Sequence, residues 1–318
     1  MSRFEVSAFG ETMLRYSVGA GERLGKLKQL EVHVGGAETN VLAALASLNR
    51  ACTWVSALPE HALGDTVLRD LRAAGIDTSG VIRRPGRVGT YYVEFSGAPR
   101  GINVIYDRAA SAVTQLAPQD IDWDYLLDTR VLHLTGITPA LSPGCHAIVL
   151  EAVQKAQQRN VTVSFDVNYR SKLWPAEEAR KGLEPILHCV DILICGEGDA
   201  ETVFGVTGSP ERILYNLRRL SPAKTIILTR SSAGSATLQD DDLVEVEAVA
   251  AEVVDRLGAG DAFSAGVLDG FLDGDIVAGM RRGSMLSALA LTQHGDMIST
   301  SRQELNSLMA AGSTALSR

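Results

Sequence analysis

Short apolar segments alternate with longer amphipathic ones along the chain, and this alternation constrains the fold more than any other feature. The strand-like segments are EVSAFG (5–10), CTWVSAL (52–58), RVLHLTG (130–136), VTVSFDVN (161–168), VDILICG (190–196) and TIILTR (225–230). The helix-like segments are VLAALASLNR (41–50), GDTVLRDLRAAG (64–75), CHAIVLEAVQKAQQRN (145–160) and PERILYNLRRL (210–220). Strands alternating with helices form a parallel sheet with helices on both faces. We therefore expect an α/β fold with a mostly parallel central sheet.

Two β-rich stretches do not fit that layer. Residues 12–34 and 88–108 alternate apolar with polar side chains and contain several glycines, which favours short hairpins over helices. They predict a small β lid over the edge of the sheet. No tandem repeat or Pro-rich linker divides the chain, so we expect a single domain over residues 1–318.

Charge and composition narrow the range of partners. The chain has 46% hydrophobic residues and a net charge of -8, and it has no long basic run, which argues for a globular protein that acts on small molecules rather than nucleic acid. Neither a leader-like N-terminus nor a stretch of about 18 apolar residues is present, so we expect a cytoplasmic protein without membrane contact. The four cysteines form no CxxC pair and are expected to be reduced thiols.

The segment DRLGAGDAFSAG (255–266) is the strongest candidate for chemistry. It follows the strand-like AEVVD (251–255) and opens an apolar helix, so the amides of Gly258, Ala259 and Gly260 would point outward at the positive end of the helix dipole, where an anion binds well. Asp261 could accept the proton of a substrate hydroxyl during phosphoryl transfer. The alternative is an ordinary helix cap, because Asp is also common at helix starts. Neither a GxxxxGK[ST] P-loop nor a GxGxxG motif occurs.

Together with an early Gly35-Gly36-x-x-x-Asn40, this late segment resembles the two signatures of the ribokinase-like, or PfkB, carbohydrate kinases. Within that family, GGAETN, VGTYYVEF, YDRAASA, HLTGITPALSP and DVNYRSKLW are similar to successive signatures of 2-keto-3-deoxygluconate kinases. The resemblance implies a ribokinase-like fold and ATP-dependent phosphorylation of the 6-hydroxyl of a keto sugar acid, with Asp261 as general base. It also implies Mg²⁺ and a homodimer or higher homo-oligomer.

The resemblance assigns the substrate side to nine residues. Gly35, Gly36 and the backbone near Ile137 would border the sugar, Asn40 would lie beside it, and Asp296 would contact a hydroxyl. Arg108 and Arg170 would bind the carboxylate with forked hydrogen bonds, and Tyr91 and Tyr106 would donate from the lid. The alternatives stay open: the tyrosines could be cross-strand packing partners, and either arginine could form a structural ion pair.

The nucleotide side is implied in the same way. Gly258 and Gly260 would approach the phosphates, and a loop containing Arg230, Ser231 and Gly234 would lie beside the adenosine. Asp199 would contact Mg²⁺ through water. Asp255, with backbone oxygens near Leu257, Gly295 and Ser299, would hold a monovalent cation such as K⁺.

Three departures from the family pattern affect this side. Gly196 and Asp199 stand where Asn (or, in this subgroup, Ser) and Glu are usual, and Ser231 replaces a glycine. Arg256 occupies a position that is normally Thr, Ser, Val or Pro, and its head group is expected to extend into solvent rather than to a phosphate. A fructokinase or other neutral-sugar kinase, and a sugar-binding homologue with weakened ATP use, therefore remain as alternatives.

Overall fold

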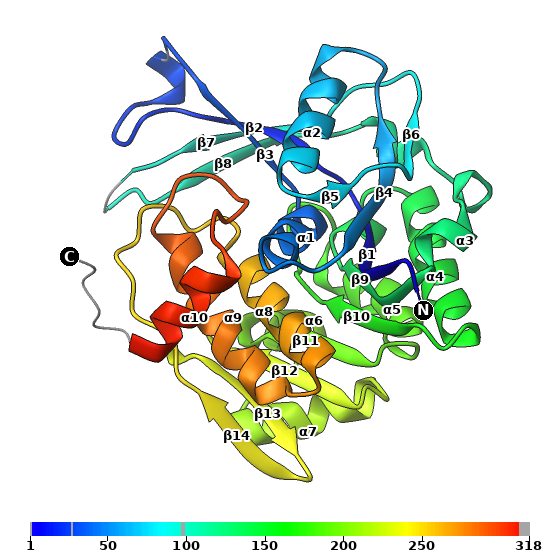
Figure 1. Ribbon diagram of the computed structural model, residues 1–318, viewed down its shortest axis with the longest axis vertical. Helices are drawn as coiled ribbons and strands as arrows, with labels where there is room; N and C mark the ends of the chain where they lie inside the picture. The colour runs from blue at the N-terminus through cyan, green and yellow to red at the C-terminus, as the bar shows by residue number, and fades with distance from the viewer. Residues whose placement is uncertain (1, 27, 97–98, 312–318) are drawn as a thin grey trace.

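A large twisted sheet runs through the molecule between two layers of helices (Figure 1). The structure is a computed structural model that describes residues 2–26, 28–96 and 99–311. The strand order is β14-β13-β12-β11-β10-β9-β1-β4-β5, with β6 paired to β4. The strands are β1 Phe4–Phe9, β4 Cys52–Leu58, β5 Ile76–Asp77, β6 Val81–Arg83, β9 Thr129–Thr135, β10 Thr162–Asp166, β11 Ile192–Gly196, β12 Thr225–Thr229, β13 Ser235–Gln239 and β14 Asp242–Val246.

In the large sheet, neighbouring strands are parallel along the row β5-β4-β1-β9-β10-β11-β12, and β13 and β14 add an antiparallel hairpin at one edge. The expected α/β class with a mostly parallel sheet is thus confirmed. The expected strand at 251–255 is wrong, because this segment has no regular secondary structure. The amides of Val254 and Asp255 instead donate to the carbonyl of Leu291, at the end of a helix. This contact leaves those two amides unavailable for a strand ladder.

Helices cover both faces, as expected, because alternate side chains of each strand point to opposite sides. The helices are α1 Ala37–Ser47, α2 Ala62–Ala73, α3 Trp123–Leu126, α4 Pro143–Gln158, α5 Ala176–Leu187, α6 Glu197–Phe204, α7 Pro210–Leu220, α8 Ala259–Asp273, α9 Ile276–Leu291 and α10 Arg302–Ala311. Leu132 and Leu134 of β9 belong to one hydrophobic core with side chains of α4, α5, α6 and α7, whereas Val131 belongs to a second core with side chains of α1, α2, α8, α9 and α10. Short 3-10 turns are η1 Leu24–Lys26, η2 Ala112–Gln115, η3 Pro118–Asp120, η4 Thr138–Ala140 and η5 Ser231–Ala233.

Helices α8 and α9 cross with their backbones in close contact. A Cβ atom on Gly266 would lie 2.2 Å from the amide nitrogen of Gly283, and one on Gly270 would lie 2.2 Å from the Cα of Gly279. Glycine is therefore required at this crossing by space alone. The close contact fixes α8, the helix that begins at the GAGD segment.

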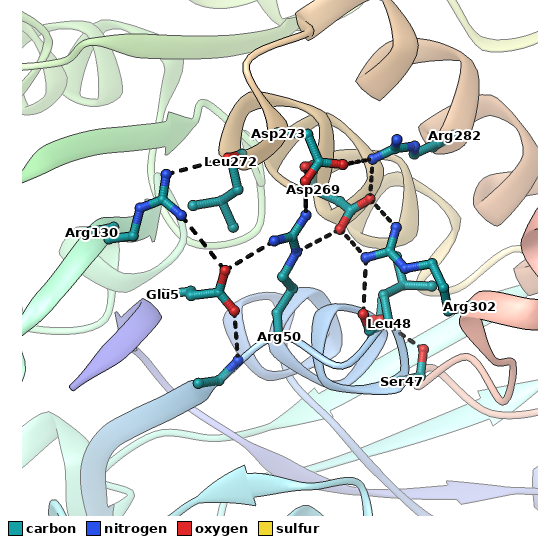
Figure 2. Close-up of polar contacts among 12 residues, drawn as sticks. Glu5, Ser47, Leu48, Arg50, Arg130, Asp269, Leu272, Asp273, Arg282 and Arg302 are labelled. Carbon is teal, nitrogen blue, oxygen red and sulfur yellow. Dashed lines mark hydrogen bonds and ion pairs between the residues drawn. The ribbon is translucent and has the colours of Figure 1, made fainter. Parts of the chain in front are cut away.

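An ion-pair network holds the other end of α8 (Figure 2). The buried carboxylate of Asp269 accepts from Arg50 at 2.8 Å, from Arg282 at 2.5 Å and from Arg302 at 2.6 Å. Arg50 also pairs with Glu5 of β1 at 3.0 Å. The network therefore joins α8 to α9, α10 and the sheet.

A second, four-stranded sheet projects from one end of the molecule (Figure 1). Its strands lie in the order β3 Glu31–Gly35, β2 Met13–Ser17, β7 Thr90–Glu94 and β8 Asn103–Asp107. We call it the small sheet. All four strands come from the two segments expected to form the lid. Residues 27, 97 and 98 of these segments lie outside the described part of the chain, as do residues 1 and 312–318 of the expected domain.

The register of the small sheet sorts its side chains onto two faces. His33, Arg15, Tyr91 and Tyr106 are neighbours across the four strands, and so are Val32, Tyr16, Tyr92 and Ile105 on the opposite face.

The four cysteines are free thiols, three of them buried. Within the described ranges, no helix combines the length and apolar character needed to cross a membrane.

Candidate active site

The GAGD segment forms the tight start of helix α8. Gly258 has a left-handed φ of 83°, and a Cβ there would lie 2.1 Å from the carbonyl oxygen of Asp296. A Cβ on Gly260 would meet no atom within 4 Å. The first amides of a helix have no partner in its own backbone, so this open helix start can bind an anion.

Asp261 lies in the first turn of α8 and faces helix α1. Its Oδ2 accepts a hydrogen bond of 2.7 Å from the side-chain amide of Asn40. Burial and the charge of Asp166 raise the pKa of Asp261 to about 7, although the Asn40 bond acts in the opposite direction. A carboxylate with this pKa can exchange a proton near neutral pH. The helix-cap alternative does not describe it, because the cap residue is Gly258 and no side-chain cap bond forms.

A second carboxylate, Asp166, lies near Asp261, and a third, Asp199, lies near Asp166. Asp166 ends strand β10, and burial together with the charge of Asp199 raises its pKa to about 7. Burial also raises the pKa of Asp199, whose Oδ2 accepts from the amide of Tyr169 at 3.1 Å. The positive charge of Arg170 acts against the rise in pKa of all three carboxylates, so this arginine lies close to the group formed by Asp166, Asp199 and Asp261. Sequence reasoning missed Asp166, although an acid at the carboxyl end of a parallel strand was a usable signal.

A cavity of about 600 Å³ opens between the small sheet and the loop after β10. Its lining includes Tyr106 and Arg108 from the small-sheet side and Arg170 and Lys172 from the loop. Lys172 donates to the carbonyl of Val104 at 2.9 Å and was not singled out from the sequence. Three cations thus border one cavity in a protein of net negative charge.

The two predicted arginines differ in their contacts. Arg108 donates to the buried carboxylate of Glu11 at 2.7 Å, so the ion-pair alternative is realised while the residue still lines the cavity. Arg170 is exposed and donates to the carbonyl of Tyr169 at 3.2 Å. Glu11 also accepts from Ser111 and was not predicted. Its bonds fix the position of Arg108.

The two predicted tyrosines stack across strands β7 and β8, with ring centroids 5.7 Å apart. Tyr106 is 37% exposed and lines the cavity. Tyr91 is 3% exposed, and its hydroxyl donates to Asp296 at 2.6 Å. The cross-strand packing alternative is therefore realised for both rings, and Tyr106 alone of the two reaches the cavity lining.

The glycine pair before helix α1 lies where backbones come close. A Cβ on Gly35 would lie 2.5 Å from the Tyr91 hydroxyl, and one on Gly36 would lie 2.2 Å from the carbonyl oxygen of Glu11. Ile137 is half-buried at the start of η4, and its amide donates to Thr135 at 3.2 Å.

Asp255 and Asp296 converge on a residue that the sequence did not reveal. Arg15 of β2 donates to Asp255 and to Asp296, at 2.5 Å in each case. Burial alone would lower the pKa of Arg15, but the two carboxylates raise it. Arg15 therefore stays charged, and Asp255, the expected cation ligand, already has a cationic partner.

The expected adenosine loop follows strand β12. Arg230 pairs with Glu245 of β14, and Ser231 is exposed with a left-handed φ of 50°. A Cβ on Gly234 would lie 2.0 Å from the carbonyl oxygen of Val246. Arg256 is exposed, in agreement with its expected extension into solvent.

An open parallel sheet, a helix start suited to an anion and a carboxylate whose pKa is raised to about 7 are the features expected of a phosphotransferase that acts on an alcohol. The model of the "pfkB family carbohydrate kinase" family matches residues 3–303, and the chain belongs to this family of sugar kinases. The expected family and the expected class of enzyme are thus confirmed.

Relatives match over nearly the whole chain. The "2-dehydro-3-deoxygalactonokinase" of Haloferax volcanii is 34% identical, with 99% of each chain covered. The "2-dehydro-3-deoxygluconokinase" of Bacillus subtilis is 30% identical, with 98% of this chain and 97% of the relative covered. The crystal structure of 2-dehydro-3-deoxygluconokinase from Thermotoga maritima has a TM-score of 0.90 at 33% identity, covering 97% of this chain and 98% of that one.

Proposed function

We propose that the protein uses ATP to phosphorylate the 6-hydroxyl of 2-keto-3-deoxygluconate, also called 2-dehydro-3-deoxygluconate, or of a closely related keto sugar acid. The observation that carries this proposal is the cationic cavity, to which Arg108, Arg170 and Lys172 contribute. Arg108 already pairs with Glu11, but among the described residues Arg170 and Lys172 form no ion pair, and a substrate carboxylate could accept forked hydrogen bonds from Arg170. Asp261 is not among the residues that line this cavity, and the link between the two is Arg170, which lines the cavity and whose charge acts on the pKa of Asp261.

In this proposal the sugar carboxylate lies at Arg170 and Arg108, with Tyr106 beside it. Gly35, Gly36 and Ile137 border the rest of the sugar. Tyr91 and Asp296 form a buried pair behind Gly35 and position that wall.

Asp261 is the general base of the proposed reaction. It takes the proton of the sugar hydroxyl while that oxygen bonds to the γ-phosphorus, and the bond from that phosphorus to ADP breaks. Asn40 orients the carboxylate through its 2.7 Å hydrogen bond. The amides of Ala259 to Asp261 stabilise the charge that develops on the transferred group.

The remaining residues suit a nucleotide and Mg²⁺. The open space at Gly260 leaves room for phosphate, and the loop of Arg230, Ser231 and Gly234 would border the adenosine. Asp166 and Asp199 are half-buried carboxylates with raised pKa values, which a divalent cation would lower, and oxygen ligands suit Mg²⁺. These two residues would hold the ion, largely through water, and its charge would offset that of the nucleotide phosphates.

A substrate panel tests the specificity. ADP release is measured with 2-keto-3-deoxygluconate, its 4-epimer 2-keto-3-deoxygalactonate, fructose, ribose and adenosine. We expect the highest kcat/KM with a keto sugar acid. Arg170→Gln should raise KM for that acid at least tenfold, because one charged hydrogen-bonding partner is lost, whereas the exposed Arg69→Gln control should not. Turnover confined to fructose, ribose or adenosine would refute the proposal.

The 4-epimer is a second candidate substrate. It is favoured by the Haloferax volcanii relative, which is 34% identical and whose name specifies the galactonate form. The two epimers in the panel separate these candidates directly.

The other alternative left open by the sequence is a sugar-binding homologue with weakened ATP use, and it is tested through Asp261. Asp261→Asn should abolish ADP release while calorimetry still detects sugar binding. If ADP release by the wild-type protein is not detectable and sugar still binds, the homologue without efficient catalysis is the better description.

We also propose that the chain folds as one domain, that the small sheet acts as a lid, and that two copies pair through its outer face. Val32 and Ile105 on that face are 52% and 50% exposed, and between them Tyr16 and Tyr92 stack at 5.5 Å. An exposed apolar row of this kind favours association. Sedimentation should give a dimer for the wild type and a monomer for the Val32→Glu, Ile105→Glu double variant.

A further inference from the structure

The ion pairs of Arg15 connect the small sheet to the turn that precedes helix α8. The Arg15 side chain is fully buried, and its two terminal nitrogens donate to Asp255 and Asp296 at 2.5 Å each. Its guanidinium carbon also lies 5.2 Å from the centre of the Phe95 ring, within the range of a cation-π contact. A charged group is rarely buried to this degree unless it is paired, so the two carboxylates and Arg15 form one unit.

This unit supports the GAGD turn from two sides. Asp255 is three residues before Gly258, and its Oδ1 accepts from the amide of Leu257 at 3.0 Å. The carbonyl oxygen of Asp296 lies 2.1 Å from where a Cβ of Gly258 would be, so residue 296 packs directly behind the turn. The position of the anion-binding amides therefore depends on Arg15 through both carboxylates.

The same contacts do not suit a bound monovalent cation at Asp255. Oδ1 is used by Leu257, and Oδ2 accepts from Arg15 and from the amide of Gly295 at 3.3 Å. Two of the segments expected to supply carbonyl ligands, at residues 257 and 295, thus direct amide donors toward the carboxylate. A K⁺ ion bound to this carboxylate would also lie next to the guanidinium charge, which would repel it.

We propose that Arg15 is the resident cation of this site: it is a positioning residue that holds the anion-binding turn of α8 in place, so that the kinase needs no K⁺ or Na⁺. This inference depends on the sugar kinase activity of the family and not on the identity of the sugar.

The wild-type protein provides the first test. Initial rates are measured with K⁺, Na⁺ or tetramethylammonium as the sole monovalent cation, at constant ionic strength and constant MgATP, with any sugar that the substrate panel shows to be turned over. We expect rates within about twofold of one another. In the ligand-free protein, the melting temperature should be the same in K⁺ and in tetramethylammonium. A tenfold or greater activation by K⁺, or a rise in melting temperature specific to K⁺, would overturn the proposal.

Variants of Arg15 provide the second test. Arg15→Gln removes the charge and should raise KM for ATP and lower kcat, together at least tenfold in kcat/KM, and added K⁺ or guanidinium ion should restore part of the loss. Arg15→Lys keeps the charge and should retain more activity. The control is Arg3→Gln, which removes an exposed arginine immediately before strand β1. Unchanged kinetics in Arg15→Gln would refute the positioning role.

If Arg15→Gln does not fold, the wild-type cation series and Arg15→Lys still decide the question. Failure of the substrate proposal leaves both measurements intact, because the melting experiment needs no sugar and the rate experiment uses whichever sugar is accepted.

Discussion

Asp261 couples the proposed reaction to pH, because a general base acts only when it is deprotonated. With the pKa of Asp261 at about 7 before substrate binds, kcat/KM should rise with pH through this value and level off above it. Before Mg²⁺ binds, the pKa of Asp166 lies in the same range, so the rising limb for the free enzyme reports the coupled pair. A pH series of kcat/KM from 5.5 to 9 measures its midpoint.

Two variants check the origin of that midpoint. Asp166→Asn removes a negative neighbour and should move the limb to lower pH. Asn40→Ala removes a hydrogen bond to the charged carboxylate and should move it to higher pH. The comparison uses the position of the limb and not the height of the plateau. If neither variant moves the limb, Asp261 is not the group that titrates.

Gly258 and Gly260 are separated by a single residue, yet we expect opposite results when each is changed to Ala. Gly258→Ala should lower the melting temperature, because the new Cβ meets a backbone oxygen at a left-handed φ. Gly260→Ala should leave the melting temperature nearly unchanged and raise KM for ATP, because its Cβ would occupy open space proposed for phosphate. Thermal melting and ATP titration of both variants measure this. Equal loss of stability in the two would contradict it.

At the scale of elements, helix α8 depends on the ion pairs at Asp269. Asp269→Asn should lower the free energy of unfolding by about 3 kcal/mol, because three arginines lose a buried ionic partner. The exposed Asp124→Asn, which removes a surface pair with Arg159, should change it by less than about 1 kcal/mol. Urea denaturation of both variants at pH 7 gives the comparison, and similar values for the two would contradict a special role for the network.

The secondary structure could be predicted where periodicity and composition agreed. The strand at 52–58 and the helix at 210–220 have the observed bounds, because each is a continuous pattern with clear ends. Helix α5 was missed, since Pro185 interrupts a segment whose first half is mostly charged. The supposed strand at 251–255 has apolar residues, but Val253 and Val254 are 48% and 41% exposed.

The site could be predicted where its residues belong to a local motif, as at Gly258 to Asp261. Arg15 could not, because its partners lie 240 and 281 residues away along the chain. In the sequence, an arginine in an alternating strand is indistinguishable from a solvent-facing one. Glu11, which fixes Arg108, was missed for the same reason: its partner is 97 residues away.

At the scale of the whole molecule, a buried histidine makes stability depend on pH. His133 lies on β9 in the middle of the large sheet, and burial lowers its pKa from 6.5 to about 4. The unfolded chain therefore binds a proton between pH 6.5 and 4 that the folded protein does not. Across this range the wild type should lose about 3 kcal/mol of unfolding free energy relative to His133→Gln.

Urea denaturation of both proteins at several pH values from 7 to 4 isolates this effect. Carboxylates such as Asp166 and Asp261, whose pKa values are raised, act in the opposite direction, because the folded protein binds their protons first. They are common to both proteins and cancel in the difference. A difference that stays constant with pH would show that His133 does not carry the effect.

The two halves of the site are built from different parts of the molecule. The cavity takes its cations from the residue that follows β8 and from the loop after β10, whereas the body of helix α8 is fixed by its glycine crossing with α9 and by Asp269. Substitutions at positions 106, 108 or 172 can therefore accumulate during descent without disturbing the helix that carries Asp261. Such a division lets a lineage of kinases exchange one sugar for another while the reaction itself is inherited unchanged.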